Sequence, residues 1–501
     1  MVSSITRRTF GRMAASSAVT VGLGIQTSPV RALETTEISW TSDDPHLTGN
    51  YAPIGKEIDA SNLVVVAGRI PSQLTGAYMR NGPNPLFKPI YYSYPMDGDG
   101  MIHAIYLEGG RARYRNRFVQ TSSLAVERRA GRAVYGSFTH PVPIDPALIG
   151  PQDHPGPFKN GAFISVLSHG GHLLALDEAT SCYEMTMDLE TLGEWTAGTD
   201  KPIRLGAHNR RHSKTGILFT LAYSVRDPSV EFHQIDSSGK LAKTFSVALK
   251  APTMIHDFVI TERYIVLLAG PAIFDLQAAQ SGKQMLQWEP NLGTRIGLIA
   301  LDGSSTKWLE AEPFFVFHFG NAFERGGHLF IDYVRHDRLN LGYAAANQQP
   351  PTLHRMNIDP AKGNISDEAV TNMVVEFPRV NDALNSLPTR FVYLPTLTET
   401  LKIPSPPSAT FNTIMKVNTE TGDVIRHDLG NRVVGEAVFV PRSANGTEDE
   451  GYLATFAFDP TTKTSDFVLL DAAHLDDEPV AVVRLPQRVP QGLHGNWIPR
   501  A

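Results

Sequence analysis

The stretch Gly-Leu-Ile-Ala-Leu-Asp-Gly at residues 297–303 shows the pattern that decides the fold. Its apolar run has the length of a β-strand, and the Asp302-Gly303 pair that ends it is a turn signal. Similar runs recur from residue 61 onward, and together they predict antiparallel β-meanders. The predicted strands are Leu63–Val66, Gly171–Leu176, Gly216–Ala222, Tyr264–Leu268, Gly297–Leu301, His328–Tyr333, Tyr452–Phe458 and Phe467–Asp471.

The composition also favours an all-β fold. The 501 residues include 35 Pro and 41 Gly, which indicates many short elements joined by tight turns. Candidate helices are confined to residues 274–285 and 380–387, which would be insertions over a β scaffold. Because no sequence period is apparent, a propeller, a pair of sandwiches and a large barrel all remain open.

Several classes of function are disfavoured by charge and motifs. The net charge is −6, and no Lys/Arg run follows the N-terminal region, so a nucleic-acid partner is not expected. The chain has no phosphate loop, no Gly-x-Ser-x-Gly elbow and no sign of a protein partner. The Asp97-Gly98-Asp99-Gly100 run lacks the later ligands of a calcium loop, so it predicts a hairpin turn.

The first 32 residues have the pattern of an export signal. Arg7-Arg8-Thr9-Phe10 precedes a weakly apolar stretch at residues 13–25, and Val30-Arg31-Ala32 suits a cleavage site. The apolar stretch is about half the roughly 20 residues that a membrane span needs. We therefore expect a removable twin-arginine signal at residues 1–32, a periplasmic location and a single domain over residues 33–501.

Four of the 17 histidines stand in distinctive local contexts. Any one histidine is more often structural, but a histidine in an apolar run either buries an unpaired polar group or binds something. Neutral imidazole is the commonest protein ligand for transition metals. The sequence intervals are too long for a zinc-finger loop, so these side chains converge only in a closed fold, such as one per propeller blade. The four are His208 in Gly206-Ala207-His208, His256 in Met254–Phe258, His318 in Phe315–Glu324, and His494 in Gly492–Trp497.

The chain resembles the carotenoid cleavage oxygenases, a family of non-haem iron dioxygenases that cleave carotenoids, apocarotenoids or stilbenes. The four histidine contexts are similar to those of the family's iron ligands, and further blocks match in family order from about residue 60 to 498. Each block is weak alone, but the ordered set is specific. The further blocks are Arg80–Pro85, Asp97–Met101, Lys159-Asn160, Leu173–Leu176, Glu376-Phe377-Pro378 and Gly435-Glu436.

The resemblance implies a seven-bladed β-propeller with Fe(II) on its axis and a dome of loop and helix insertions. The four histidines would bind the iron, and no further catalytic side chain is required. Glu178, Glu376 and Glu436 match the family carboxylates that orient the ligands; a carboxylate that accepts the other ring N–H fixes the imidazole tautomer.

The implied reaction is cleavage of a conjugated C=C bond by O2 to give two carbonyl products. A carotenoid or apocarotenoid is the leading substrate, because a long polyene needs an apolar tunnel. Simple core packing is the alternative interpretation of each aromatic residue among the proposed tunnel residues. These residues are Phe87, Phe138, Phe163, Ile164, Phe274, Phe319 and Trp497.

The chain departs from its relatives at several positions. Ile164 replaces a Thr that lies near the open iron position in many members, and the loop after His208 is altered, with His212 as a distant competitor for the ligand role. Phe138 and Asp177 stand where stilbene-cleaving members have a Tyr and a Lys. Cleavage of a stilbene or another phenylpropanoid alkene, a non-catalytic lipophile-binding propeller and peripheral membrane contact all remain open.

Overall fold

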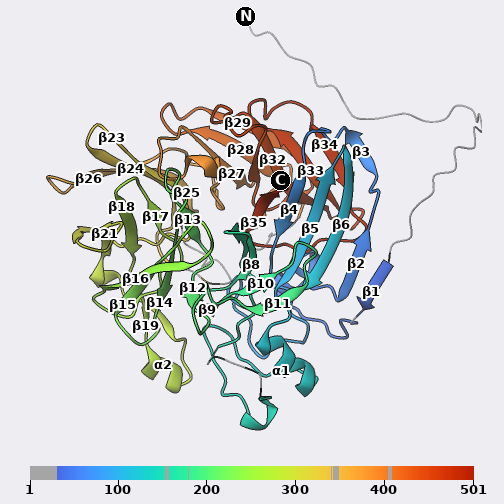
Figure 1. The fold of residues 1–501 in the computed structure, drawn as a ribbon, viewed down its shortest axis with the longest axis horizontal. Coiled ribbons are helices and arrows are strands. Elements are labelled where there is room, and N and C mark those ends of the chain that lie inside the picture. Colours follow the sequence, from blue (N-terminus) through green and yellow to red (C-terminus); the bar gives the residue numbers. More distant parts are fainter. Residues whose placement is uncertain are drawn as a thin grey trace, which may run out of the picture.

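The computed structural model describes residues 31–500 except 36, 152, 154, 155, 157, 179, 340, 342–348 and 404–408. Seven antiparallel sheets of three to six strands stand around a common centre, as Figure 1 shows. This is a seven-bladed β-propeller, so the predicted all-β fold is confirmed and the sandwich and barrel alternatives are wrong. Most of the expected export signal lies outside the described residues.

Five blades are built from consecutive stretches of chain, and we number them in chain order. Blade 1 contains β7 (Ser165–His169), β8 (His172–Leu176), β10 (Tyr183–Met185) and β11 (Thr191–Glu194). Blade 2 contains β13 (Asn209–Arg211), β14 (Leu218–Tyr223), β15 (Ser229–Ile235) and β16 (Leu241–Ala248). Blade 3 contains β17 (Val259–Ile260), β18 (Tyr264–Ala269), β21 (Thr294–Ala300) and β22 (Thr306–Ala311). Blade 4 contains β23 (Phe319–Arg325), β24 (His328–Arg335), β25 (Thr352–Asp359) and β26 (Asn364–Ala369), and blade 5 contains β27 (Phe391–Thr396), β28 (Thr413–Asn418) and β29 (Val424–Asp428).

The last two blades join the two ends of the chain. In blade 7 the C-terminal strand β35 pairs with β4, and in blade 6 the N-terminal strand β3 pairs with β34. These two pairings close the ring of blades and leave only the short outer edges that a propeller has. Blade 6 contains β30 (Val433–Val434), β31 (Val438–Pro441), β32 (Gly451–Asp459), β33 (Thr464–Asp471), β34 (Ala481–Arg484) and β3 (Val65–Gly68). Blade 7 contains β35 (Gly495–Pro499), β4 (Gly76–Arg80), β5 (Met101–Glu108), β6 (Arg111–Phe118), β2 (Lys56–Ala60) and β1 (Arg31–Thr35).

Three long connections form a cover that we call the dome: residues 81–100, 119–164 and 270–293. They contact one another, because Phe138 N donates to Asp97 and Met285 N donates to the Thr139 carbonyl. Helices α1 (Ser122–Ala130) and α2 (Leu276–Gln280) belong to the dome and lie outside the sheets at the lower edge of Figure 1. The small elements are the pairs β9 (Thr180–Ser181) with β12 (Arg204–Leu205) and β19 (Ala272–Phe274) with β20 (Leu286–Trp288), and the 3-10 turns Pro45–Leu47, Gly49–Tyr51, Pro146–Leu148, Pro290–Leu292 and Asp382–Leu384.

Three sequence predictions need correction. The expected helix at 274–285 is shorter and is α2 alone. The expected helix at 380–387 is a single 3-10 turn, because Asn381 caps it and the chain turns again at Ser386, whose φ is +72°. The Asp97–Gly100 run is no hairpin turn: it ends a 20-residue connection between β4 and β5. Asp97 accepts from the backbone N–H groups of Ser93 and Phe138, so the run anchors dome loops to one another.

Among the described residues, no helix is long and apolar enough to cross a membrane.

Candidate metal centre

The four predicted ligand histidines converge at the centre of the ring. His208, His318 and His494 each come directly before the innermost strand of blades 2, 4 and 7, and His256 lies three residues before the innermost strand of blade 3. One ring nitrogen from each histidine lies within 4.8 Å of the other three. His212, the alternative ligand, is buried elsewhere, with its ring near the Glu262 carbonyl. The closed ring thus brings together four residues that are far apart in sequence.

The geometry of the four rings suits a metal ion. The Nε2 atoms of His208 and His256 are 3.1 Å apart. Two ligands about 2.1 Å from one metal and at right angles to each other lie about 3.0 Å apart, so this spacing fits neighbouring coordination positions. His318 Nε2 is buried without a hydrogen-bond partner among the described residues. A buried lone pair of this kind is costly unless it binds something.

Three of the four histidines each face one of the carboxylates that the family resemblance implies. Glu178 Oε2 lies 2.9 Å from His256 Nδ1. His318 Nδ1 donates to Glu376 at 2.5 Å, and His494 Nδ1 donates to Glu436 at 3.0 Å. Because each Nδ1 faces a carboxylate, it carries the proton and Nε2 keeps its lone pair for a metal.

The blades divide this work between them. Blades 2, 3, 4 and 7 supply the histidines at the start of their inner strands. The other three blades supply the carboxylates from their loops: Glu178 follows β8 of blade 1, Glu376 precedes β27 of blade 5, and Glu436 lies between β30 and β31 of blade 6. Every blade therefore contributes one side chain to the centre.

Each of two carboxylates has a further partner that the sequence did not reveal. Glu376 also accepts from His336 Nε2 at 2.7 Å. Glu436 accepts from Arg379 at 3.4 Å and from the backbone N–H of Gly495 at 2.7 Å. Burial alone would raise the pKa of both carboxyls, but the neighbouring histidines and Arg379 outweigh it and hold both pKa values below their usual range. Both groups are therefore ionised near neutral pH.

Burial favours the neutral, metal-binding form of two of the histidines, His208 and His318. Burial lowers the pKa of His208 well below its usual value, and the other three imidazoles act in the same direction. Burial likewise lowers the pKa of His318, although Glu376 partly opposes it. His256 differs: burial would lower its pKa, but Glu178 outweighs burial and raises it.

Asn81, in the family-like stretch at residues 80–85, holds a loop beside the metal centre. The Asn81 side chain donates to the carbonyls of Ala162 and Ser165, at 2.7 Å and 3.0 Å. Between these two residues, the Ile164 carbonyl accepts from the backbone N–H of His494 at 3.1 Å. These bonds fix the loop that carries Ile164 against the fourth ligand.

Two aromatic rings that the sequence interpretation did not single out flank the imidazoles. The Phe317 ring centre is 5.3 Å from that of His256, and the Phe377 ring centre is 5.2 Å from His318 and 5.3 Å from His494. Phe377 has a φ of +52°, a strained conformation for this residue type. The only sequence signal for either ring was its place beside a predicted ligand or carboxylate.

The structure does not bring the seven proposed tunnel residues to one place. Phe163 and Ile164 are buried near the centre, and Phe138 and Phe274 face each other in the dome with ring centres 5.9 Å apart. Phe87 belongs to a separate cluster with Leu86, Met101, Phe118 and Leu124. Phe319 and Trp497 instead border a different cavity, on the side of the centre away from the dome.

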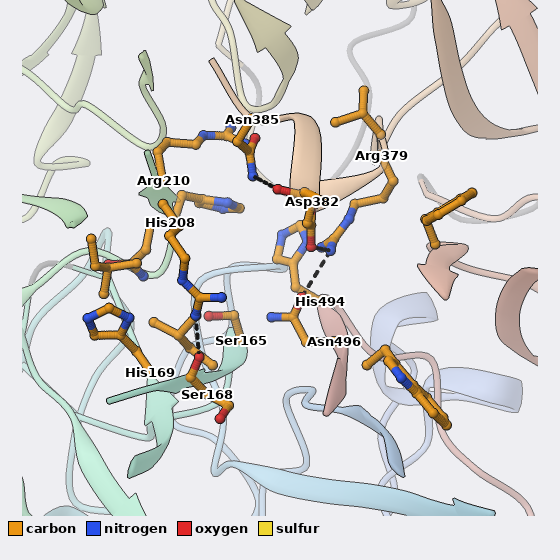
Figure 2. A pocket seen from close by; sticks show the side chains of 18 of the residues that line it. Ser165, Ser168, His169, His208, Arg210, Arg379, Asp382, Asn385, His494 and Asn496 are labelled. Atoms are coloured by element: carbon orange, nitrogen blue, oxygen red, sulfur yellow. Dashed lines mark hydrogen bonds and ion pairs between the residues drawn. The ribbon is translucent and has the colours of Figure 1, made fainter. Parts of the chain in front are cut away.

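This cavity, which we call the axial cavity, has a volume of about 560 Å³. It runs along the inner strands β7, β13, β23 and β35 and reaches His208, His318 and His494. Among the described residues, none of the three dome segments lines it. About half of its wall is polar, and Figure 2 shows the polar side chains Ser165, Ser168, Arg210, Arg379, Asp382 and Asn496 along it.

Known proteins share this fold and sequence. Residues 51–499 match the family model described as RPE65, retinal pigment epithelial membrane protein. A carotenoid cleavage oxygenase of Mycobacterium tuberculosis (strain CDC 1551 / Oshkosh) is 31% identical, over 93% of this chain and 99% of its own length. A carotenoid 9,10(9',10')-cleavage dioxygenase of Pisum sativum is 30% identical, over 92% of each chain.

A solved structure is similar over almost the whole chain. The lignostilbene dioxygenase of Pseudomonas brassicacearum has a TM-score of 0.83 and 27% identity, over 91% of this chain and 99% of that chain. A non-haem metal site, which holds iron in this family, agrees with the four converging histidines. With its matched sequence, its seven blades and its central histidines, this chain belongs to the carotenoid cleavage oxygenase family.

Proposed function

We propose that the protein binds Fe(II) through His208, His256, His318 and His494 and cleaves a conjugated C=C bond of an apolar substrate with O2. The observation that carries this proposal is the convergence of four histidine side chains, three of them facing buried carboxylates. Bound Fe(II) would supply the electrons that activate O2 toward an electron-rich alkene. The C=C bond breaks, and each of its two carbons receives one oxygen atom as a carbonyl.

The protein's own residues would position the metal and keep water away. Glu178, Glu376 and Glu436 would hold the rings of His256, His318 and His494 with the Nε2 atoms aimed at the metal. Phe163, Ile164 and Phe317 would form an apolar surround for the alkene, because all three are buried beside the centre. No side chain is needed as a general base, since no proton leaves the substrate in this reaction.

A carotenoid or apocarotenoid is the substrate class that we propose first. The M. tuberculosis and pea relatives are named for carotenoid cleavage. Asp177 stands where stilbene-cleaving members have a Lys, and its carboxylate accepts from the backbone N–H groups of Gly161, Ala162 and Glu178. The Asp177 carboxylate therefore cannot replace the Lys ammonium group that would bind a phenol. The similarity to the lignostilbene dioxygenase keeps a stilbene as the second candidate.

We also propose that residues 1–32 direct export to the periplasm through the twin-arginine pathway. The support is the Arg7-Arg8-Thr9-Phe10 pattern and the weakly apolar stretch after it. Strand β1 begins at Arg31, so the proposed cleavage after Ala32 would shorten this strand. Cell fractionation after changing Arg7 and Arg8 to Lys tests the proposal: the altered protein should stay in the cytoplasm.

Product analysis tests the enzyme proposal. The protein is reconstituted anaerobically with Fe(II) and then exposed to O2 with a panel of apocarotenals, carotenoids and stilbenes. Mass spectrometry should find two carbonyl products whose atoms together equal one substrate plus O2. Protein loaded with Zn²⁺, which has no redox chemistry, is the matched control and should give none.

The outcomes separate the candidates. Carbonyl pairs from the polyenes alone support the carotenoid assignment, whereas pairs from the stilbenes alone replace it with the second candidate. Tight iron binding with no cleavage of any substrate in the panel would replace the enzyme with a lipophile-binding propeller.

A further inference from the structure

The two sides of the metal centre differ in how well they can accommodate a metal ion. Toward the dome, Phe163, Ile164 and Phe317 are buried and pack in apolar clusters. On the other side, the axial cavity reaches three of the four histidines directly. Only His256 is absent from its lining, and this histidine has Phe317 beside it.

We propose that the axial cavity is the route by which a hydrated divalent metal ion enters and leaves the folded protein. A divalent ion that passes through an apolar enclosure must give up its water with nothing to replace it, which costs a large amount of free energy. Along the axial cavity, hydroxyl, carbonyl and carboxylate oxygens stand in for the lost water. These are the groups that hard cations accept as ligands.

The charged side chains that line the cavity besides the histidines are three arginines and three carboxylates, so their charges balance. Arg211 donates to the Ser168 carbonyl at 2.6 Å, and the other two arginines pair with the carboxylates. Arg210 pairs with Asp257 at 2.5 Å, and Arg379 pairs with Asp382 at 2.9 Å and with Glu436 at 3.4 Å. Because the arginines and carboxylates are matched, the cavity neither repels a cation strongly nor forms a competing acidic site. The four histidines therefore remain the tightest place for the ion.

The wall between the cavity and solvent contains a polar cluster. Figure 2 shows Arg379 reaching toward both Asp382 and Asn496, with His494 close behind. Asp382 and its neighbour Ala383 are exposed, whereas Arg379 is largely buried. A substitution at an exposed position such as Ala383 therefore changes neither a histidine ligand nor a carboxylate that orients a ligand.

This route rests on the proposed metal site, and it makes a kinetic prediction that a ligand defect does not. A plug in a route raises the barrier between the free and the bound ion but leaves both end states alone. Entry and release then slow by the same factor, and the dissociation constant is unchanged. Damage to the ligands instead raises the release rate and weakens binding.

Two plug variants come from different walls of the cavity. Ser168→Phe fills it from β7, and Ala383→Trp fills it from the 3-10 turn at Asp382–Leu384. The matched controls are Ser246→Phe and Ala242→Trp, which place the same side chains on exposed positions of β16. Neither control residue lines the cavity.

Anaerobic stopped-flow mixing of folded apo-protein with Fe(II), followed by release into the chelator ferrozine, measures both rates. We expect each plug variant to slow entry and release by about tenfold or more, with the dissociation constant unchanged within about twofold. The controls should exchange iron at the rate of the unaltered protein. Circular dichroism checks that all variants are folded.

Normal exchange rates in both folded plug variants would overturn the route, as would faster release with weaker binding. Uptake of iron only during refolding, and never by the folded apo-protein, would overturn it as well. If the unaltered protein binds no iron at all, the proposed metal site itself fails, and this result is distinct from the other three. Cleavage activity enters none of these measurements.

Discussion

Two buried carboxyl groups near the centre, Glu436 on the axial side and Asp177 beside the dome, have opposite surroundings. On the axial side, Asp257 and Glu436 each pair with an arginine, and the pKa of Glu436 is held low. Beside the dome, Asp177 accepts from backbone N–H groups, and burial raises its pKa to about 7. An arginine partner thus keeps Glu436 ionised, whereas burial without a cationic partner favours the protonated form of Asp177. The difference agrees with the proposed entry of a metal ion from the axial side.

Removing His256, the ligand that lies beside Phe317 and does not line the axial cavity, should have the largest effect on iron binding and cleavage. His256→Ala deletes a ligand that touches the apolar side, and we expect loss of bound iron and of cleavage with the β-fold kept. The blades and their two closing strand pairs hold the ring without this side chain. Metal analysis and circular dichroism check both parts. His212→Ala, which removes a buried histidine outside the group, should keep its iron; a fully metallated His256→Ala protein would contradict the ligand assignment.

Loosening one ligand should have a smaller effect. Glu376→Gln keeps the shape of the carboxylate but weakens its bonds to His318 and His336. We expect metal affinity or activity to fall by about 10- to 100-fold, as is typical when a group that orients a ligand is changed. Iron titration and initial rates measure this. Glu231→Gln, at a surface pair with Arg204, is the control, and equal affinity in both variants would rule out the orienting role.

The smallest effect concerns the buried carboxyl beside the dome. The folded protein binds a proton at Asp177 more tightly than the unfolded chain, whose Asp pKa is near 3.8. Its contribution to stability is therefore lost as pH rises from about 4 to about 7, with a slope of at most about 1.4 kcal/mol per pH unit. Asp177→Asn removes this contribution.

Urea unfolding at several pH values measures it. The stability advantage of the unaltered protein over Asp177→Asn should shrink as pH rises toward 7 and then level off. An advantage that does not change with pH, or that grows over this range, would show that Asp177 is ionised in the folded protein throughout.

The sequence predicted the parts of the centre that have a local signature. His208, His256, His318 and His494 stand in recognisable contexts, and the ordered blocks identified the family and hence the seven blades. Strand-length apolar runs were placed well: the run at 452–458 lies within β32. Short polar inner strands such as β13, Asn209–Arg211, have no apolar pattern and were not predicted.

The remaining features depend on contacts between distant segments. His336 and Arg379 act through Glu376 and Glu436, and neither has a sequence context that reveals this role. Trp497 follows a ligand closely, yet β35 turns it toward the axial cavity instead of the dome. Which side of the ring a residue faces is set by the direction of its strand, and local sequence does not encode that direction.

The last strand of the chain, β35, completes both the ring of blades and the group of four histidines. The same short strand closes the ring and follows directly on the last histidine, His494. A chain still growing on the ribosome, or one cut short before residue 494, has at most three of the four ligands and an open ring. The full set of four histidines and the closed ring are therefore completed together, by the last strand of the chain.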